Sequence, residues 1–208
     1  MGTGLFVKAG LIALSYLAGG IPTGYLAARW FKGIDIRKHG SGNPGTANVY
    51  RVVGTGAGAV TLLGDALKGF LPVLLAQRLF PEQPWFALLC GAAAIVGHDW
   101  TVFLGFKGGK GVATSAGVFA ALTPLPLALT LLSFAGGVWG SGHISMGSLS
   151  AAAVLPVLCL LNGEPALFSA GALAASALIV YKHIPNIQRL RAERREINAA
   201  ALSAQERP

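Results

Sequence analysis

The sequence predicts an all-α polytopic membrane protein with about seven transmembrane helices, two of them short. Of its 208 residues, 53% are hydrophobic and only 12% are charged, whereas a soluble domain carries about 25% charged residues. The 29 glycines lack the period of collagen, and glycine is common in transmembrane helices. This composition argues against a soluble enzyme, and against disorder, which needs low hydrophobicity.

Five apolar stretches have roughly the 17–25 residues that cross a bilayer. They are 4–29, 57–79, 84–104, 146–162 and 166–182. The first is too long for the core of a signal peptide, so we expect it to be retained as a span. A sixth apolar run, 111–140, is interrupted by Pro124 and Pro126. Because two prolines so close together cannot continue a regular helix, we expect a short helix over about 111–122 and a second over about 125–140.

The basic residues predict the orientation. With seven spans, most of the sixteen Lys and Arg fall on one side, in 30–56, 105–110, 141–145 and 183–208. The positive-inside rule places that side in the cytoplasm and the N-terminus outside. A five-span model, in which 111–140 is peripheral, keeps this orientation. We expect one integral membrane domain over 1–185 and a cytoplasmic tail over 186–208.

The net charge of +8 suits nucleic acid, an anionic membrane surface or anionic substrates. A chain this apolar argues against nucleic-acid binding. Cys90 and Cys159 lie inside apolar runs and lack metal-ligand spacing, so we expect buried thiols and neither a disulfide nor a metal site.

A glycine-rich polar string, Gly40-Ser41-Gly42-Asn43-Pro44-Gly45-Thr46-Ala47-Asn48, follows the first span, with Arg51 just beyond it. Glycines let a loop turn its N–H groups toward an anion, and Ser and Asn add donors. An arginine can bind a phosphate through two hydrogen bonds. The first string is therefore either an anion site or an ordinary turn between spans.

A second string, Phe106-Lys107-Gly108-Gly109-Lys110-Gly111-Val112-Ala113-Thr114, opens the next apolar segment. Lysines in a glycine-rich turn at a helix N-terminus favour phosphate, because the N–H groups and the helix dipole attract negative charge. The spacing is not that of a nucleotide-binding P-loop. A positive-inside loop explains the lysines but not the glycines, so we favour an anion site.

The third string lies where the last span leaves the membrane, and it reads Ile179-Val180-Tyr181-Lys182-His183-Ile184-Pro185-Asn186-Ile187-Gln188-Arg189. Lys182 and Arg189 could be interface residues that extend toward water. His183 and Asn186 share a helix face only if the helix persists through Pro185. A lone histidine is more often structural, but beside two anion-binding loops we interpret His183 as functional.

Other polar residues lie in or beside the spans. Ser145 and Ser148 flank a helix start, and they could cap it or donate hydroxyls to a ligand. Asp65 and Lys68 are three residues apart within a span and could neutralise each other. They are either a functional pair or a structural ion pair. His98-Asp99 leaves the same two alternatives.

Several catalytic patterns are absent from the sequence. It has no H-E-x-x-H, no C-x-x-C, no G-x-S-x-G and no H-x-x-x-x-D of the thioester-dependent glycerolipid acyltransferases. What remains is a phosphate pocket lined by glycines and cations at a membrane surface, without a covalent nucleophile.

In these strings the sequence resembles the bacterial membrane acyl-phosphate:glycerol-3-phosphate acyltransferases. The resemblance rests on SGNPGTAN at 41–48, FKGGKGVAT at 106–114 and KHIPNIQRL at 182–190, with smaller matches at 65–69, 97–98 and 145–148. The chain departs from the family pattern at Thr46-Ala47, where Ala-Thr is expected, and at Lys182, where arginine is usual.

The resemblance implies transfer of a fatty acyl group from acyl phosphate to the 1-hydroxyl of glycerol 3-phosphate. The products would be lysophosphatidate and inorganic phosphate, in the first step of bacterial phospholipid synthesis. The implied catalytic residues are Ser41, Arg51, Lys110, His183 and Asn186. The implied substrate-binding residues are Gly42, Asn43, Gly45, Asn48, Gly108, Gly109, Gly111, Thr114, Ser145 and Ser148.

The expected partners are the two substrates and membrane lipid, without cofactor or metal, in a protein that could act as a monomer. The expected location is the bacterial inner membrane, with the site facing the cytoplasm. Because acyl phosphate is a mixed anhydride, no acyl-enzyme is required, and the protein mainly positions the two substrates. The alternative is a small anion transporter with a cytoplasmic phosphate vestibule. Transporters usually show repeat-related halves with a midplane site, and no halves match here.

Overall fold

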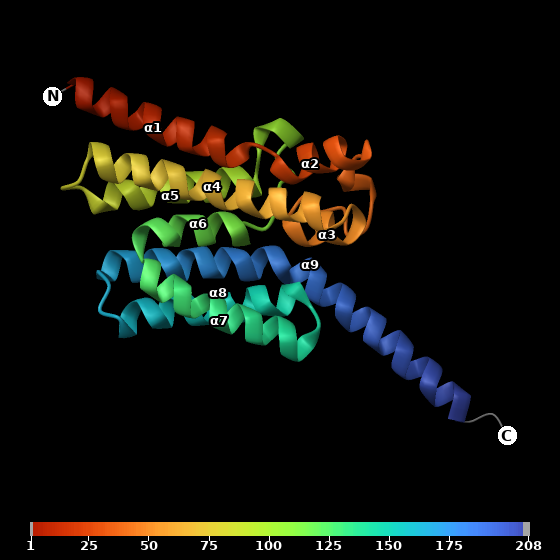
Figure 1. The fold of residues 1–208 in the computed structure, drawn as a ribbon. Coiled ribbons are helices and arrows are strands. Elements are labelled where there is room, and N and C mark those ends of the chain that lie inside the picture. The colour runs from red at the N-terminus through yellow and green to blue at the C-terminus, as the bar shows by residue number, and fades with distance from the viewer. Residues whose placement is uncertain (1, 206–208) are drawn as a thin grey trace.

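The computed structural model describes the backbone of residues 2–205 and the side chains of 4–185, 187 and 188. Within the described backbone all regular elements are helices, without strands (Figure 1). The elements in order are α1 (Gly2–Gly20), α2 (Thr23–Lys32), η1 (Ile36–Lys38), α3 (Thr46–Val52), α4 (Thr55–Leu79), α5 (Pro84–Asp99), η2 (Val102–Leu104), α6 (Val112–Leu122), α7 (Pro124–Ser141), α8 (Ile144–Leu161) and α9 (Ala166–Gln205).

Six segments of the described chain are long and apolar enough to cross a membrane, and α6 is a shorter apolar helix. The six are Gly4–Lys32, Thr55–Leu79, Pro84–Leu104, Pro124–Ser141, Ile144–Leu161 and Ala166–Pro185. This arrangement confirms the predicted all-α polytopic fold. The predicted division of 111–140 is also confirmed, because α6 ends at Leu122 and α7 begins at Pro124. Proline is tolerated at a first helical position, where its missing N–H has no partner to lose.

The predicted span over 4–29 is found as Gly4–Lys32, but it is not one unbroken helix. The chain leaves the helix at Ile21 and Pro22, so that α1 and α2 are separate helices. Proline lacks the N–H that would continue the ladder, and its ring disfavours helical geometry in the preceding residue. At the other end of the chain, α9 does persist through Pro185 and continues to Gln205. The predicted boundary between 185 and 186 therefore falls within one helix.

Glycines allow the helices to approach closely. A Cβ atom at Gly117 would overlap the backbone of Ala66, where α6 crosses α4, and one at Gly97 would overlap the backbone of Tyr16, where α5 crosses α1. Small residues at such crossings are typical of membrane helices. Cys90 and Cys159 are buried free thiols, as predicted.

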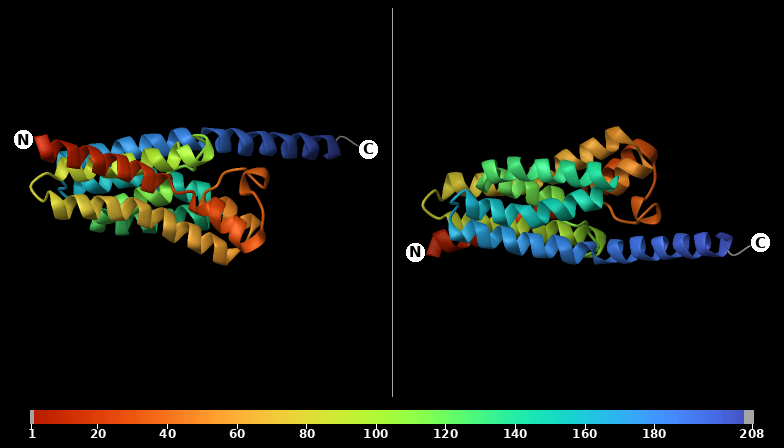
Figure 2. Two further views of the ribbon diagram at one scale, coloured as in Figure 1. Left: turned by 90° about the horizontal axis from the view of Figure 1, so that it is seen from above. Right: turned by 90° about the horizontal axis from the view of Figure 1, so that it is seen from below.

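The connections that carry the polar strings lie toward one end of the bundle. The segment 33–54, the loop 105–111 and the turn after α7 are at the end from which α9 extends beyond the other helices (Figures 1 and 2). The opposite end carries the N-terminus and the connections α4–α5 and α8–α9. This one-sided arrangement brings distant parts of the sequence within reach of one another.

Candidate functional site

The three polar strings meet around one cavity of about 760 Å³. Its lining comes from the segment before α3, from the loop before α6, from the end of α5 and from α9. The lining residues are Asp35, Arg37, Lys38, Ser41, Gly42, Asn43, Pro44, Trp100, Lys107, Gly108, Gly109, Lys110, Tyr181, Lys182, Ile184 and Pro185.

Positive charge dominates this cavity. Five cationic side chains line it against the single carboxylate of Asp35. Clustered charge of one sign in a recess concentrates ligands of the opposite sign. The cavity is therefore suited to anions. Within the described residues, no three His, Cys, Asp or Glu side chains gather as metal ligands do.

The carboxylate is bound to one of those cations. Asp35 accepts hydrogen bonds from Arg37 Nη2 at 2.8 Å and Nε at 3.0 Å, and it also accepts one from the Arg37 backbone N–H at 3.0 Å. The Arg37 guanidinium lowers the pKa of Asp35 to about 2, and the carboxylate raises the pKa of Arg37. The sequence did not point to this pair, because its charges were attributed to the orientation bias.

Asn48 organises the first string from behind. Its side chain is 3% exposed. Its Nδ2 donates to the carbonyl oxygens of His39 and Asn43, both at 3.0 Å, and its Oδ1 accepts from the Ser41 N–H at 2.9 Å. Gly42 has a φ of 71°, a left-handed conformation that favours glycine. Ser41, Gly42 and Asn43 thus reach the cavity, whereas Asn48 and Gly45 do not line it.

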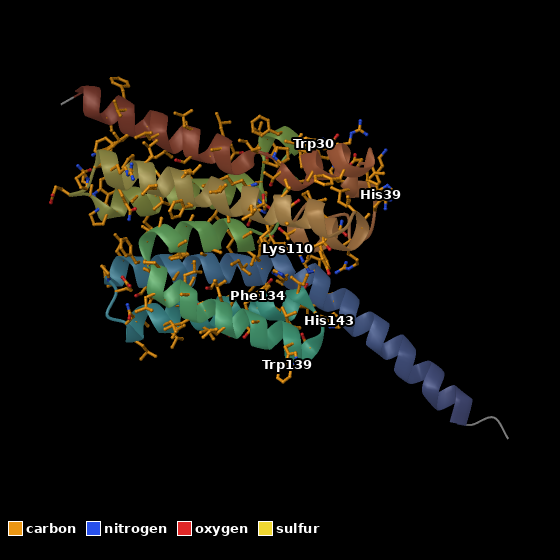
Figure 3. All side chains as sticks on the ribbon, viewed as in Figure 1. Trp30, His39, Lys110, Phe134, Trp139 and His143 are labelled. Carbon is orange, nitrogen blue, oxygen red and sulfur yellow. The ribbon has the colours of Figure 1, made fainter. Side chains whose placement is uncertain are left out.

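The second string is attached to the end of α5. The N–H of Gly108 donates to Asp99 O at 3.2 Å and that of Gly109 to His98 O at 3.1 Å. These two N–H groups are therefore already bonded within the protein. Gly111, with a φ of 72°, precedes α6 in the left-handed conformation. This turn places Lys110 in the cavity wall immediately before the N-terminus of α6 (Figure 3).

The third string contributes Lys182 directly. Lys182 Nζ donates to Asp99 O at 3.0 Å and lies 4.7 Å from the centroid of the Trp100 ring. His183 is 2% exposed, and its Nδ1 lies 2.8 Å from Ile179 O. His183 is next to the cavity rather than in its lining. The side chain of Asn186 lies outside the described residues.

The remaining predicted site residues do not line this cavity. Arg51 is exposed on α3. Thr114 is fully buried on α6, and Ser148 is buried on α8, where its hydroxyl donates to Ile144 O at 3.0 Å. Ser145 is partly exposed at the start of α8. The structure thus brings together the centre of each string, but not these four residues.

The chain is similar to known proteins over most of its length. Residues 9–193 match the family model described as glycerol-3-phosphate acyltransferase. A glycerol-3-phosphate acyltransferase of Geobacter sulfurreducens is 48% identical, over 87% of this chain and 92% of the relative. One of Geobacter metallireducens is 50% identical, over 88% and 93%.

Two solved structures have the same fold. Both are of PlsY, an integral membrane glycerol 3-phosphate acyltransferase. The glycerol 3-phosphate form has a TM-score of 0.85 and 37% identity, covering 90% of this chain and 94% of that chain. The lysophosphatidic acid form has a TM-score of 0.83 and 36% identity, covering 90% and 93%.

Proposed function

This chain belongs to the glycerol-3-phosphate acyltransferase family, and from that premise we propose that it transfers a fatty acyl group from acyl phosphate to the 1-hydroxyl of glycerol 3-phosphate. The observation that carries the proposal is the cavity where the three strings meet, with its excess of cations. Both substrates are phosphate monoanions or dianions, so an enzyme that binds them together must offset their mutual repulsion. Five cations around one cavity do so.

The reaction needs no covalent enzyme intermediate. The 1-hydroxyl oxygen attacks the acyl carbonyl carbon, the bond from that carbon to the phosphate oxygen breaks, and inorganic phosphate leaves. The hydroxyl proton goes to a phosphate oxygen. Holding two reactants in the productive orientation can supply about 7–11 kcal/mol of the barrier reduction, so positioning is the main task of the protein.

Lys110 and the first string are the groups we assign to phosphate. Lys110 lines the cavity just before the N-terminus of α6, where ammonium and helix dipole act in the same direction. Ser41 lines the facing wall. Arg51 lies three residues after Asn48 on α3, and hence on the same face of that helix. Its side chain is exposed and outside the cavity lining, so its assignment to phosphate rests on the resemblance of the first string to the family.

His183 and Asn186 orient the glycerol backbone in this proposal. If His183 Nδ1 carries the proton that is donated to Ile179 O, Nε2 is an acceptor. Nε2 would accept a hydrogen bond from a substrate hydroxyl. Because the substrate phosphate brings its own oxygen close to the attacking hydroxyl, we assign the proton to the phosphate and the orienting role to His183.

The site is proposed to face the cytoplasm of a bacterium, at the inner membrane. Trp30 and Trp139 are 85% and 92% exposed and project on either side of the bundle around Lys110 (Figure 3). Exposed tryptophans are typical of the membrane–water interface. Glycerol 3-phosphate would then enter from water while the acyl chain stays along the apolar helices. We propose one integral membrane domain that includes Asn186 of α9, acting as a monomer and without cofactor or metal.

The experiment uses purified chain in detergent with acyl phosphate and glycerol 3-phosphate. We expect release of inorganic phosphate and an equal amount of lysophosphatidate, and neither product when either substrate is omitted. Activity with an acyl thioester but none with acyl phosphate would overturn the assignment of acyl phosphate as the donor. An anion transporter would form neither product.

A further inference from the structure

The break between α1 and α2 leaves backbone carbonyls without helical partners inside an apolar segment. Unpaired carbonyls cost several kcal/mol in a lipid environment. Gly20 O and Ile21 O both accept from side chains outside the break, and Ile21 O also accepts from the Thr23 N–H at 2.9 Å. Thr101 Oγ1 donates to Gly20 O at 2.6 Å, and Lys68 Nζ donates to Ile21 O at 2.8 Å.

Lys68 belongs to a buried cluster, here called the Asp65 cluster, formed by Thr23, Asp65, Lys68 and His98. Lys68 Nζ lies 2.7 Å from Asp65 Oδ1, and His98 Nδ1 lies 3.6 Å from the same oxygen. The hydroxyl of Thr23, at the start of α2, donates to Asp65. Asp65 is 2% exposed and Lys68 is 8% exposed. The cluster thus joins α2, α4 and α5 around the helix break.

The same cluster supports the cavity wall. The His98 ring packs against Gly109 so closely that a Cβ atom at Gly109 would overlap the ring. A void of about 10 Å³, roughly the space of one water, lies between the cluster and the loops. Pro44, Gly108 and Gly109 line both this void and the larger cavity. They are therefore the wall between the cluster and the site.

We propose that Asp65, Lys68 and His98 are positioning residues of the acyl transfer. They do not touch substrate, since none of them lines the larger cavity. Lys68 and Asp65 hold the start of α2, where Gly24 packs against the carbonyl of Pro44 in the first string. His98 holds the backbone of Gly109 and with it Lys110. This inference rests on the function proposed above.

The contact between His98 and Gly109 offers a suppressor test. Gly109→Ala should push the loop off the ring, and we expect kcat/KM to fall by about 10²-fold, as for a 1 Å misplacement. His98→Ala removes the ring and makes room for the new methyl group. We expect kcat/KM of the double variant to be roughly tenfold higher than that of Gly109→Ala alone. If the two losses simply multiply, His98 does not position Gly109.

The ion pair allows stability and positioning to be separated. Lys68→Met leaves the Asp65 carboxylate buried without its cation and removes the hydrogen bond from α4 to Ile21 O, so both Tm and affinity for glycerol 3-phosphate should fall. Adding Asp65→Asn removes the buried charge and should restore Tm. It should not restore affinity, because the hydrogen bond that ties α4 to Ile21 O is still absent. Joint recovery of Tm and affinity would show a purely structural pair and overturn the proposal.

Affinity is measured as the Kd of glycerol 3-phosphate from its effect on the thermal unfolding of each variant in detergent, without acyl donor. Turnover is measured alongside for the first test. Unaltered chain that binds glycerol 3-phosphate but releases no phosphate would contradict the proposed reaction and leave the positioning result readable from Kd. If the unaltered chain is active but His98→Ala does not relieve the loss caused by Gly109→Ala, the positioning role is contradicted and the proposed reaction is not.

Discussion

The Nδ1 atom of His183 lies 2.8 Å from the carbonyl oxygen of Ile179, one turn earlier in α9. If Nδ1 carries the proton, this contact holds the plane of the ring and leaves Nε2 as the acceptor for a substrate hydroxyl. A side chain held in this way can orient a hydroxyl whether or not it accepts a proton, and the two roles predict different kinetics.

For His183→Asn we expect kcat to stay within about tenfold and the KM of glycerol 3-phosphate to rise, because the amide can still donate to Ile179 O but cannot reach as Nε2 does. His183→Gln is the matched variant, with its amide near the position of Nε2, and should keep a lower KM. Steady-state kinetics over a range of pH provide the measurement. A fall in kcat of about 10²-fold or more, with loss of the acidic limb of the profile of kcat against pH, would instead identify His183 as a general base.

Replacing Lys110 should have the largest effect among the lining residues. Lys110→Ala removes the charge in front of α6, and we expect kcat/KM to fall by about 10²–10³-fold, as when one donor to a developing charge is removed. Lys110→Arg keeps the charge with a different geometry and should retain part of the activity. Phosphate release reports both. Full activity of the alanine variant would remove Lys110 from the site.

Arg51 should behave differently, since it is exposed and outside the cavity lining. We expect Arg51→Ala to raise the KM of glycerol 3-phosphate more than it lowers kcat, and the effect should shrink at high salt, which screens exposed charges. Arg51→Lys controls for charge without the bidentate geometry. If Arg51→Ala leaves the KM of glycerol 3-phosphate unchanged at low salt, Arg51 does not bind the phosphate and the other cations do.

Removal of the Asn48 amide should disorder the first string. Asn48→Ala leaves two carbonyls and the Ser41 N–H without their partner, at a cost of about 1–3 kcal/mol for a buried unsatisfied group. Tm in detergent should fall and the KM of glycerol 3-phosphate should rise. Asn48→Asp keeps the acceptor but loses both donors, so an intermediate result is expected. Equal Tm in all three proteins would contradict this role.

The Asp35–Arg37 pair predicts how stability and the KM of glycerol 3-phosphate depend on pH. The pKa of Asp35 falls from 3.8 to about 2 in the folded chain, so its contribution to stability is present above about pH 4 and is lost as the pH falls toward 2. Asp35 therefore stays ionised throughout the neutral range. Asp35→Asn makes the lining more positive and should lower the KM of glycerol 3-phosphate by the same factor at about pH 7 and about pH 9. A factor that changes between these two pH values would show that another group titrates with the pair.

Local chemistry explains which features were predictable. Span length and the prolines at 124 and 126 are properties of short windows, and they correctly separate α6 from α7. The glycines and cations of the three strings also identified the loops that meet at the cavity. In each case the residues that decide the outcome are neighbours in the sequence.

Features that depend on distant partners were not predictable. Pro22 alone does not distinguish a kink from a break, and the broken form depends on donors from Lys68 and Thr101. Likewise Arg37 and Lys38 line the cavity although their charges fit the orientation bias equally well. A pattern within one window carries no information on which side of a loop faces the site.

The short α6 sets how deep the reaction takes place. Its 11 residues rise about 16 Å, whereas the hydrocarbon core is about 30 Å thick. α6 ends and α7 begins on either side of Thr123, at the end of the bundle opposite the polar strings. Because α6 is the shorter helix, its N-terminus lies deeper in the bundle than the last turn of α7 (Figure 1). Lys110, which precedes it, therefore lies deeper in the bundle than the end of α7. At that depth the carbonyl of a donor could meet a water-soluble acceptor while its hydrocarbon tail remains among the lipid chains.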